Sequence, residues 1–312
     1  MNIVANALLP VFLIIALGIV LKRTLLPSDE AWLSIERLTY FVLFPALLIV
    51  TTGTADLTGI PARDMATVLV ASTALLAILL LLIRPLFDRL FSIEGPSFTS
   101  IFQASTRFNS YISLALAGSL YGAKGLALMS VPLIALIPLF NVINVWVLAQ
   151  FASDEKMDAR TITGHILRNP LIWSCIVGIA INLVGLPLPK FAIAFAEILG
   201  RASLAIGLLL VGAGLAIKEI WKLNVATVTA TLLKLVLLPL TAISLAKALG
   251  LEGPPLAIVA IVTSVPTAPA SYILARQMGG DAPLVARILT FQTAVAFITV
   301  TIALATAGIL KP

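Results

Sequence analysis

Charged side chains are scarce in this sequence. Asp, Glu, Lys and Arg make up 11% of its 312 residues, and hydrophobic residues make up 60%. Soluble proteins carry about 25% charged and about 45–50% apolar residues, so these proportions exclude a water-soluble protein and indicate an integral membrane protein. The net charge of +6 is not gathered into a dense basic run, and we therefore expect no nucleic-acid partner.

Residues for metal-dependent or covalent chemistry are equally scarce. The chain has one His and one Cys, and a single Cys excludes an intrachain disulfide framework. The sequence contains neither a HExxH zinc motif nor a Walker A phosphate-binding loop. We therefore predict that the protein is neither an enzyme nor an ATP-driven pump, and that it has no cofactor and no metal.

Long apolar runs fill most of the chain. A membrane helix needs roughly 20 predominantly apolar residues, and this criterion predicts ten transmembrane helices. Their predicted ranges are 3–21, 38–52, 66–83, 98–121, 126–151, 170–186, 193–217, 225–249, 255–278 and 284–309.

The longest polar stretch, residues 152–169, divides the ten predicted spans into five and five. We expect a first five-helix repeat at 1–151 and a second at 170–312, and an odd number of spans per half inverts the second repeat in the membrane. Lys and Arg are enriched in cytoplasmic loops. Twelve of them fall in the odd-numbered loops against six in the even-numbered loops and the C-terminus, which predicts that 152–169 is cytoplasmic and that both termini are not.

The fourth and ninth spans resemble each other and both contain a signal for a helix break. Each carries Ser-Tyr-Ile before a Gly-containing segment, at 110–112 and at 271–273. In the ninth span, Pro266 and Pro269 disfavour helix at the residues before them, so we predict an unwound segment there. In the fourth span, a polar cluster at 106–110 contains Asn109, a good helix cap. Transporters built from inverted repeats bind substrate at such paired breaks.

Half-helices that begin at a break favour an anion, because their N-termini carry partial positive charge and unpaired N–H groups. Arg107 is a charge within a span, which suggests either a functional site or a side chain that reaches an interface. Lys234, within the eighth span, either neutralises a substrate carboxylate or reaches a wet cavity. The sequence does not choose among proton-coupled, sodium-coupled and uncoupled transport. Asp56 and Asp281 are the acids nearest to the spans.

Four segments resemble the auxin efflux carrier family of membrane transporters. They are "YFVLFPALLI", "RFNSYISLALAGSLYG", "RNPLIWSCIVGIAINLVGLPLP" and "SVPTAPASYILARQMGGD", and they occur in the family's order over nearly the whole chain. The resemblance implies a fold similar to that of bile-acid/sodium symporters: two inverted five-helix repeats with broken fourth and ninth helices that cross at the substrate site. It also implies elevator-type transport and a homodimer.

The same resemblance implies that Asn109 is the asparagine of the first crossing helix and Pro266 the proline of the second. Plant members carry a proline at the first crossing, where this chain has Phe108 and Asn109, and they also have a long central loop that this chain lacks. The missing proline argues against auxin as the substrate, and the missing loop argues against phosphorylation-based regulation of the plant kind.

Together, these patterns predict a multi-pass protein of the cell membrane that moves a small organic anion, such as a mono- or dicarboxylate. A membrane sensor or scaffold of the same fold, or a sodium-coupled symporter of another solute, is the alternative. The predicted substrate-binding residues are Pro45, Thr106, Arg107, Asn109, Ser110, Lys234, Pro266, Thr267, Pro269, Ser271 and Tyr272.

Overall fold

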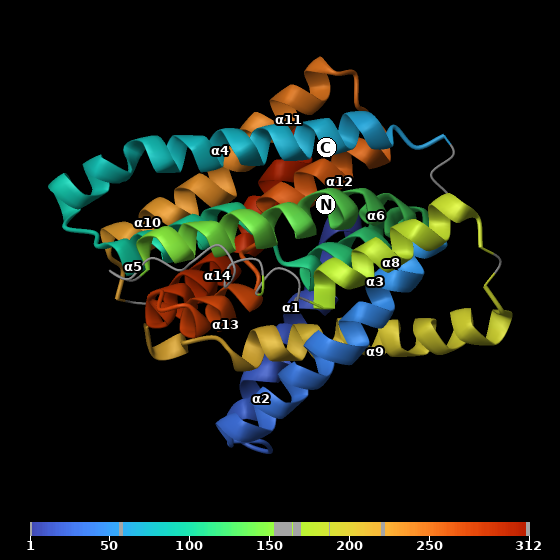
Figure 1. Ribbon diagram of the computed structural model, residues 1–312, viewed down its shortest axis with the longest axis horizontal. Coiled ribbons are helices and arrows are strands. Elements are labelled where there is room, and N and C mark those ends of the chain that lie inside the picture. Colours follow the sequence, from blue (N-terminus) through green and yellow to red (C-terminus); the bar gives the residue numbers. More distant parts are fainter. Residues whose placement is uncertain are drawn as a thin grey trace.

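The apolar runs of the sequence are helices in the computed structural model, which describes residues 2–55, 59–152, 164, 170–186, 188–219 and 222–309 (Figure 1). The first half contains α1 (Asn2–Arg23), α2 (Asp29–Leu38), the π-helical turn η1 (Thr39–Leu43), α3 (Phe44–Gly53), α4 (Ala62–Phe91), α5 (Gly95–Thr106) and α6 (Ser110–Phe151). The second half contains α8 (Pro170–Val184), α9 (Lys190–Ala213), the 3-10 turn η2 (Ile217–Glu219), α10 (Val225–Leu232), the π-helical turn η3 (Leu233–Leu237), α11 (Leu238–Ala248), α12 (Gly253–Ser264), α13 (Ala270–Gln277) and α14 (Ala282–Thr306). Asp56 and nearly all of the predicted loop 152–169 lie outside the described residues.

Seven helical segments of the described residues are long and apolar enough to cross a membrane. One of them, Gly95–Phe151, holds two of the predicted spans, which separate at Gly122, where φ is 55° and ψ is −136°. Glycine tolerates this left-handed region because it has no Cβ. Two shorter apolar helices are present at Trp173–Val184 and Gly253–Ser264. The prediction of an all-α membrane protein with about ten helices is confirmed.

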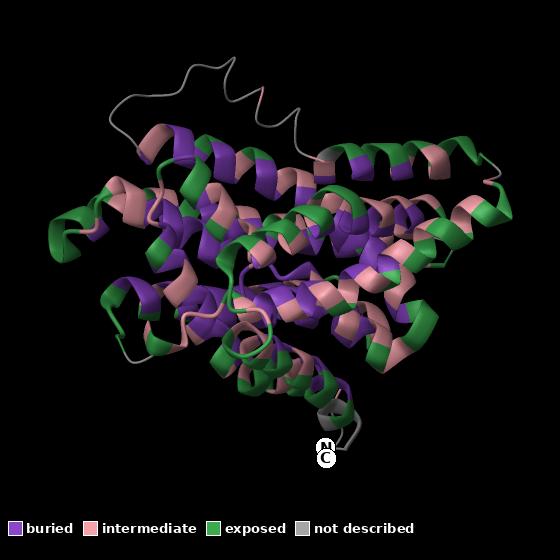
Figure 2. Cartoon of the chain, turned by 90° about the horizontal axis from the view of Figure 1, so that it is seen from below, coloured by how far each residue is buried: buried purple, intermediate pink, exposed green. Residues whose placement is uncertain are grey.

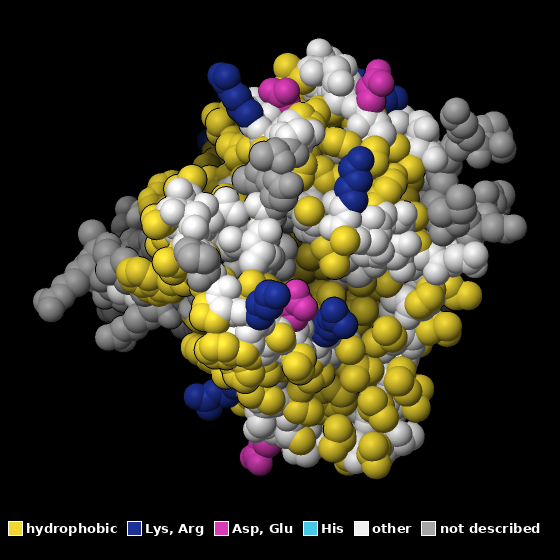
Figure 3. All heavy atoms as spheres, turned by 90° about the vertical axis from the view of Figure 1, so that its right-hand side faces the viewer, with side chains coloured by type: hydrophobic (Ala, Val, Ile, Leu, Met, Phe, Trp, Pro, Cys, Tyr) yellow, Lys and Arg dark blue, Asp and Glu magenta, His cyan; other side chains and the backbone are white. Residues whose placement is uncertain are grey.

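Large apolar side chains cover much of the outer surface, as lipid contact requires. Figure 3 shows one face on which hydrophobic side chains predominate and charged side chains are scattered. Exposed residues of this kind include Leu13, Leu82, Phe191 and Ile298. The buried side chains gather instead in the interior between the helices (Figure 2).

The second span is longer than predicted, and its predicted start at residue 38 is wrong. The helix begins at Asp29, where Ser28 is the N-cap and its Oγ accepts a hydrogen bond from the N–H of Ala31 at 3.4 Å. It continues through η1 and α3 to Gly53 as one apolar segment of 25 residues. Glu36, which the predicted boundary assigned to a loop, therefore lies on a membrane-spanning helix.

The helices pack into two bundles. One, the α9 bundle, comprises α1, α2, η1, α3, α8 and α9, with α9 in contact with α1, α2, η1 and α3. The other, the α6 bundle, comprises α4–α6 and α10–α14, including η3. Contacts between the bundles are made mainly by α6, which touches α1, α3, α8 and α9. In Figure 1, α2, α3 and α9 lie along the lower side, and α4, α11 and α12 along the upper side.

Both predicted helix breaks are present. The first separates α5 from α6 at residues 107–109, where Arg107 is extended with φ −73° and ψ 155°. Asn109 then caps α6, because its Oδ1 accepts hydrogen bonds from the N–H groups of Tyr111 at 3.1 Å and Ile112 at 3.2 Å. A side-chain acceptor at this position replaces the missing helical partners of the first turn. The break therefore follows from the capping residue without a proline.

The second break separates α12 from α13 at residues 265–269. Val265 is extended with φ −74° and ψ 157°, as expected for a residue before proline. Pro269 is the N-cap of α13. The N–H of Thr267 donates a hydrogen bond to Oε1 of Gln292 at 2.9 Å, so a side chain from α14 satisfies backbone that the prolines have freed.

The two breaks cross. The N–H of Asn109 donates to the carbonyl of Pro266 at 2.9 Å, which joins the unwound segments directly. Gln292 strengthens the junction, since its Nε2 also donates to the carbonyl of Ala104 at 3.2 Å. Unwound backbone inside a membrane must find such partners, because each unpaired group costs several kcal/mol in lipid.

The helices that precede the breaks share a sequence signal at their starts. Glu94-Gly95-Pro96 begins α5 and Glu252-Gly253-Pro254 begins α12. Both helices have Glu as the N-cap, both are 12 residues long, and both end at an extended residue with nearly the same φ and ψ. The sequence prediction used the Ser-Tyr-Ile segments and did not include this similarity between the starts of α5 and α12.

Candidate functional site: a cleft at the crossing of two broken helices

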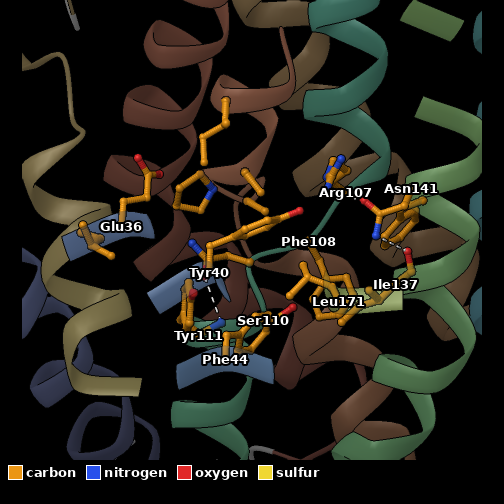
Figure 4. A pocket seen from close by; sticks show the side chains of 17 residues that line it. Glu36, Tyr40, Phe44, Arg107, Phe108, Ser110, Tyr111, Ile137, Asn141 and Leu171 are labelled. Atoms are coloured by element: carbon orange, nitrogen blue, oxygen red, sulfur yellow. Dashed lines mark hydrogen bonds between the residues drawn. The ribbon is translucent and has the colours of Figure 1, made fainter. Parts of the chain in front are cut away.

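A cleft, called the chamber below, opens where the two bundles meet, beside the crossing (Figure 4). Together with its open side, it spans about 680 Å³ of space between protein atoms. The α9 bundle contributes Glu36, Tyr40, Phe44, Leu171 and Leu210 to its wall. The α6 bundle contributes Arg107, Phe108, Asn109, Ser110, Tyr111, Ile137, Phe140, Asn141, Ala268, Pro269, Ala270 and Ile273.

The chamber continues along α2 and toward the end of α13. A second hollow shares Glu36, Tyr40, Arg107 and Asn141 with it, and adds residues including Leu33, Arg37 and Gln277. These added side chains are polar or exposed, whereas the inner wall is mainly aromatic and aliphatic. A solute therefore approaches past a mixed wall that includes Arg37 and Gln277, and reaches a mainly apolar chamber that contains a few polar groups.

Arg107 supplies the positive charge of the chamber. Its side chain is only 6% exposed, and its Nη2 donates a hydrogen bond to Oδ1 of Asn141 at 3.2 Å. Among the described residues, Nη1 has no hydrogen-bond partner. Figure 4 shows Arg107 and Asn141 on the same side of the chamber. This placement favours a functional role over an arginine that reaches a membrane interface.

Asn109 supplies a second donor at the same break. Its Oδ1 is used in capping α6, while its Nδ2 is buried and has no partner within the part of the chain that the structure describes. An unmet buried N–H costs about 1–3 kcal/mol. The chamber thus has two donors without protein acceptors, beside the positive end of the α6 dipole. This combination is suited to a carboxylate.

Of the predicted site residues, Arg107, Asn109, Ser110 and Pro269 line the chamber. Thr106, Pro266, Thr267 and Ser271 are buried outside the chamber wall and hold the crossing together. The hydroxyls of Thr267 and Ser271, for example, lie 3.1 Å apart. The structure therefore places these four as supports of the site.

Three predicted residues lie elsewhere. Lys234 is 1% exposed in η3, which packs on α5, α12 and α14 and contributes nothing to the chamber wall. Tyr272 lines a neighbouring hollow together with Lys22 and Arg276, and this hollow shares Glu36, Leu210 and Pro269 with the chamber. Pro45 follows the chamber residue Phe44 at the start of α3, directly after the π-helical turn that carries Tyr40. Pro45 thus helps to position the wall without lining it.

Glu36, Tyr40 and Asn141 also line the chamber but were not among the residues predicted from the sequence. Ser28 followed by Asp29 and Glu30 is a helix-start signal, and it would have placed the start of the helix early enough to include Glu36. Asn141 does bond within its own helix, through Nδ2 to the carbonyl of Ile137 at 2.9 Å. Its partnership with Arg107 depends on a tertiary contact between residues 34 positions apart.

Comparison with known families gives one match. A family model described as "Membrane transport protein" matches residues 3–304, which is nearly the whole chain. A comparison with curated proteins found no match. The matched region includes both helix breaks and every residue that lines the chamber.

Proposed function

Because the chain belongs to the auxin efflux carrier family of membrane transport proteins, we propose that it is a secondary transporter that moves a small organic anion across the cell membrane. The family is one of transporters and is not catalytic, and the multi-pass helical fold agrees with it. The anion we propose is a mono- or dicarboxylate, bound in the chamber at the crossing of the broken helices.

One observation carries the choice of an anion. Nη1 of Arg107 and Nδ2 of Asn109 are buried donors that have no acceptor among the described residues, and both residues line the chamber. A carboxylate has two oxygens that accept several hydrogen bonds, and a charge-assisted bond is roughly twice as strong as a neutral one. A solute without an acceptor group would leave both donors unpaired.

We further propose that the two halves, 1–151 and 170–312, are inverted repeats. The matched Glu-Gly-Pro starts of α5 and α12, their equal lengths and their extended ends support this relation. The Ser-Tyr-Ile segments also follow the two breaks at nearly the same position, with Ser110 first in α6 and Ser271 second in α13. The excess of positive charge in the odd-numbered loops supports termini on the non-cytoplasmic side.

The division into bundles supports an elevator-type mechanism. Both breaks, and therefore both unpaired donors, belong to the α6 bundle, while the α9 bundle forms only the opposite wall. Sliding of the α6 bundle along the α9 bundle would carry the bound anion with it and open the chamber to the other side. Rigid-body movement of one bundle against another is a common form of alternating access.

An Asn109→Asp variant tests the anion site while keeping the helix cap. The new carboxylate still accepts the hydrogen bonds of Tyr111 and Ile112, but it replaces the Nδ2 donor by a negative charge. In a thermal-shift screen of the purified protein with acetate, benzoate and succinate, we expect at least one of these carboxylates to stabilise the native protein, and the stabilisation to disappear in the variant.

Asn224→Asp is the matched control, because Asn224 caps α10 through its Oδ1 and lies outside the chamber. It should keep the full response. Stabilisation of Asn109→Asp equal to that of the native protein would show that the carboxylate binds elsewhere. Stabilisation by a cation or a neutral solute alone would contradict the anion assignment.

A further inference from the structure

Glu36 brings a carboxylate into the chamber. It lies on α2, within the membrane-spanning segment 29–53, and its side chain is half-buried. It lines the chamber, the second hollow and the hollow beside Tyr272. In Figure 4 it lies on the side of the chamber opposite Arg107, with Tyr40 between them. No other acidic residue among those that the structure describes lines the chamber.

Within the described ranges of the chain, Glu36 has no cationic partner. Its carboxylate forms no ion pair and accepts no hydrogen bond from any described residue. Of the described residues in the chamber wall, Arg107 is the one cation, and its bond is to Asn141. In a partly apolar wall, the charged form of a carboxylate without a counter-charge is destabilised, because it has lost part of its hydration.

The other groups that face Glu36 do not supply the missing positive counter-charge. Tyr40 and Tyr111 are phenols, which are neutral near pH 7. Arg37 is an exposed cation of the second hollow. The hollow beside Tyr272 adds Lys22, Asp29, Glu30 and Arg276, of which Lys22 and Asp29 form an ion pair with each other. From α9, only the apolar residues Leu210, Ala213 and Gly214 reach these hollows.

We propose that Glu36 takes up a proton when the anion binds, so that anion and proton occupy the chamber together. The inference rests on the proposed function. Two negative charges in one small apolar space repel each other strongly, and the chamber holds a single buried cation to balance them. A proton from water on the open side forms an O–H bond with a Glu36 carboxylate oxygen and returns to water when the anion leaves. One anion and one proton therefore bind and leave as a pair.

The sign of the pH dependence follows from this linkage. Because the anion binds best to the form that carries the proton, its affinity rises as the pH falls. When one full proton is taken up for each anion bound, the affinity changes by about tenfold for each pH unit. Elevator movement of the α6 bundle would also separate the anion from Glu36, which stays with α2, and so would tie proton release to the change of access.

Calorimetry tests the proposal directly. Succinate and benzoate are titrated into the native protein at pH 6, 7 and 8, in buffers of different ionisation enthalpy, which reports the number of protons taken up. We expect uptake of up to one proton per anion in the native protein and none in Glu36→Gln. The variant should also bind with an affinity that is nearly independent of pH, and about tenfold more tightly than the native protein at pH 8.

Glu30→Gln is the matched control, since Glu30 is an exposed carboxylate on the same helix outside the chamber. It should retain native proton uptake, and Glu36→Asp, which keeps a titrating carboxylate, should regain it. Undiminished uptake in a folded Glu36→Gln protein, or no uptake in the native protein, overturns the proposal while the transporter assignment stands. If neither carboxylate binds the native protein, the anion site itself is wrong and this inference fails with it.

Discussion

Replacement of Arg107 by glutamine is expected to weaken carboxylate binding about 100-fold. Hydrogen bonds to charged groups contribute about 1.5–3 kcal/mol each, and Nη1 of Arg107 is a buried donor free to make one. Glutamine retains a donor for Asn141 or the ligand but removes the charge. The loss therefore measures the charge-assisted interaction, and titration calorimetry with succinate or benzoate reads it directly.

The effect should depend on position and not on the net charge of the protein. Arg201→Gln makes the same change in charge at a residue on α9 that is exposed, 3.9 Å from Glu197, and outside the chamber. We expect its affinity to stay within about twofold of the native value, because exposed charges are well screened. Equal losses in the two variants would mean that the charge acts at long range and that Arg107 does not contact the anion.

A disulfide between the two bundles is expected to stop transport. Tyr111 of α6 packs against Gly207 of α9 so closely that a Cβ added at Gly207 would lie 2.5 Å from Cγ of the tyrosine. The two Cβ positions are therefore at most about 4 Å apart, which suits a disulfide. A Gly207→Cys, Tyr111→Cys protein, with Cys175→Ala to remove the native thiol, should form this bond on mild oxidation.

In proteoliposomes, oxidation of the double-cysteine protein should lower carboxylate flux at least tenfold, because the α6 bundle can no longer move along the α9 bundle. A reductant should restore the flux, which makes each sample its own control. Each single-cysteine protein should be insensitive to the oxidant. Full flux through a protein shown by mass spectrometry to be cross-linked would contradict elevator movement at this interface.

Local sequence signals were sufficient to predict both helix breaks. Pro266 and Pro269 remove backbone donors and restrict the residues before them, and Asn109 is a strong N-cap, so each break follows from residues within one turn of it. The separation of the fourth and fifth spans at Gly122 was equally accessible, since the left-handed conformation there favours glycine. The apolar composition predicted the membrane, and four segments in the family's order predicted the family.

The wall of the chamber was less accessible from sequence. Glu36 was missed because the span was predicted to begin at Leu38, whereas the helix begins at Asp29, directly after its N-cap Ser28. Lys234 was a candidate because it is a charge within a span, yet spacing along one helix does not show which neighbour a side chain faces. Its position among α5, α12 and α14 follows from tertiary packing. The bond from Arg107 to Asn141 likewise depends on how two segments meet in space.

We propose that an organic anion occupies the chamber at the crossing of the broken helices. The most direct test is an experimental structure of the protein with a bound brominated carboxylate, such as 4-bromobenzoate, located by its anomalous signal. We expect bromine density within the chamber, with the carboxylate within hydrogen-bond distance of Nη1 of Arg107 and Nδ2 of Asn109. Density beside Lys234, or in the hollow beside Tyr272 with the chamber empty, would contradict it.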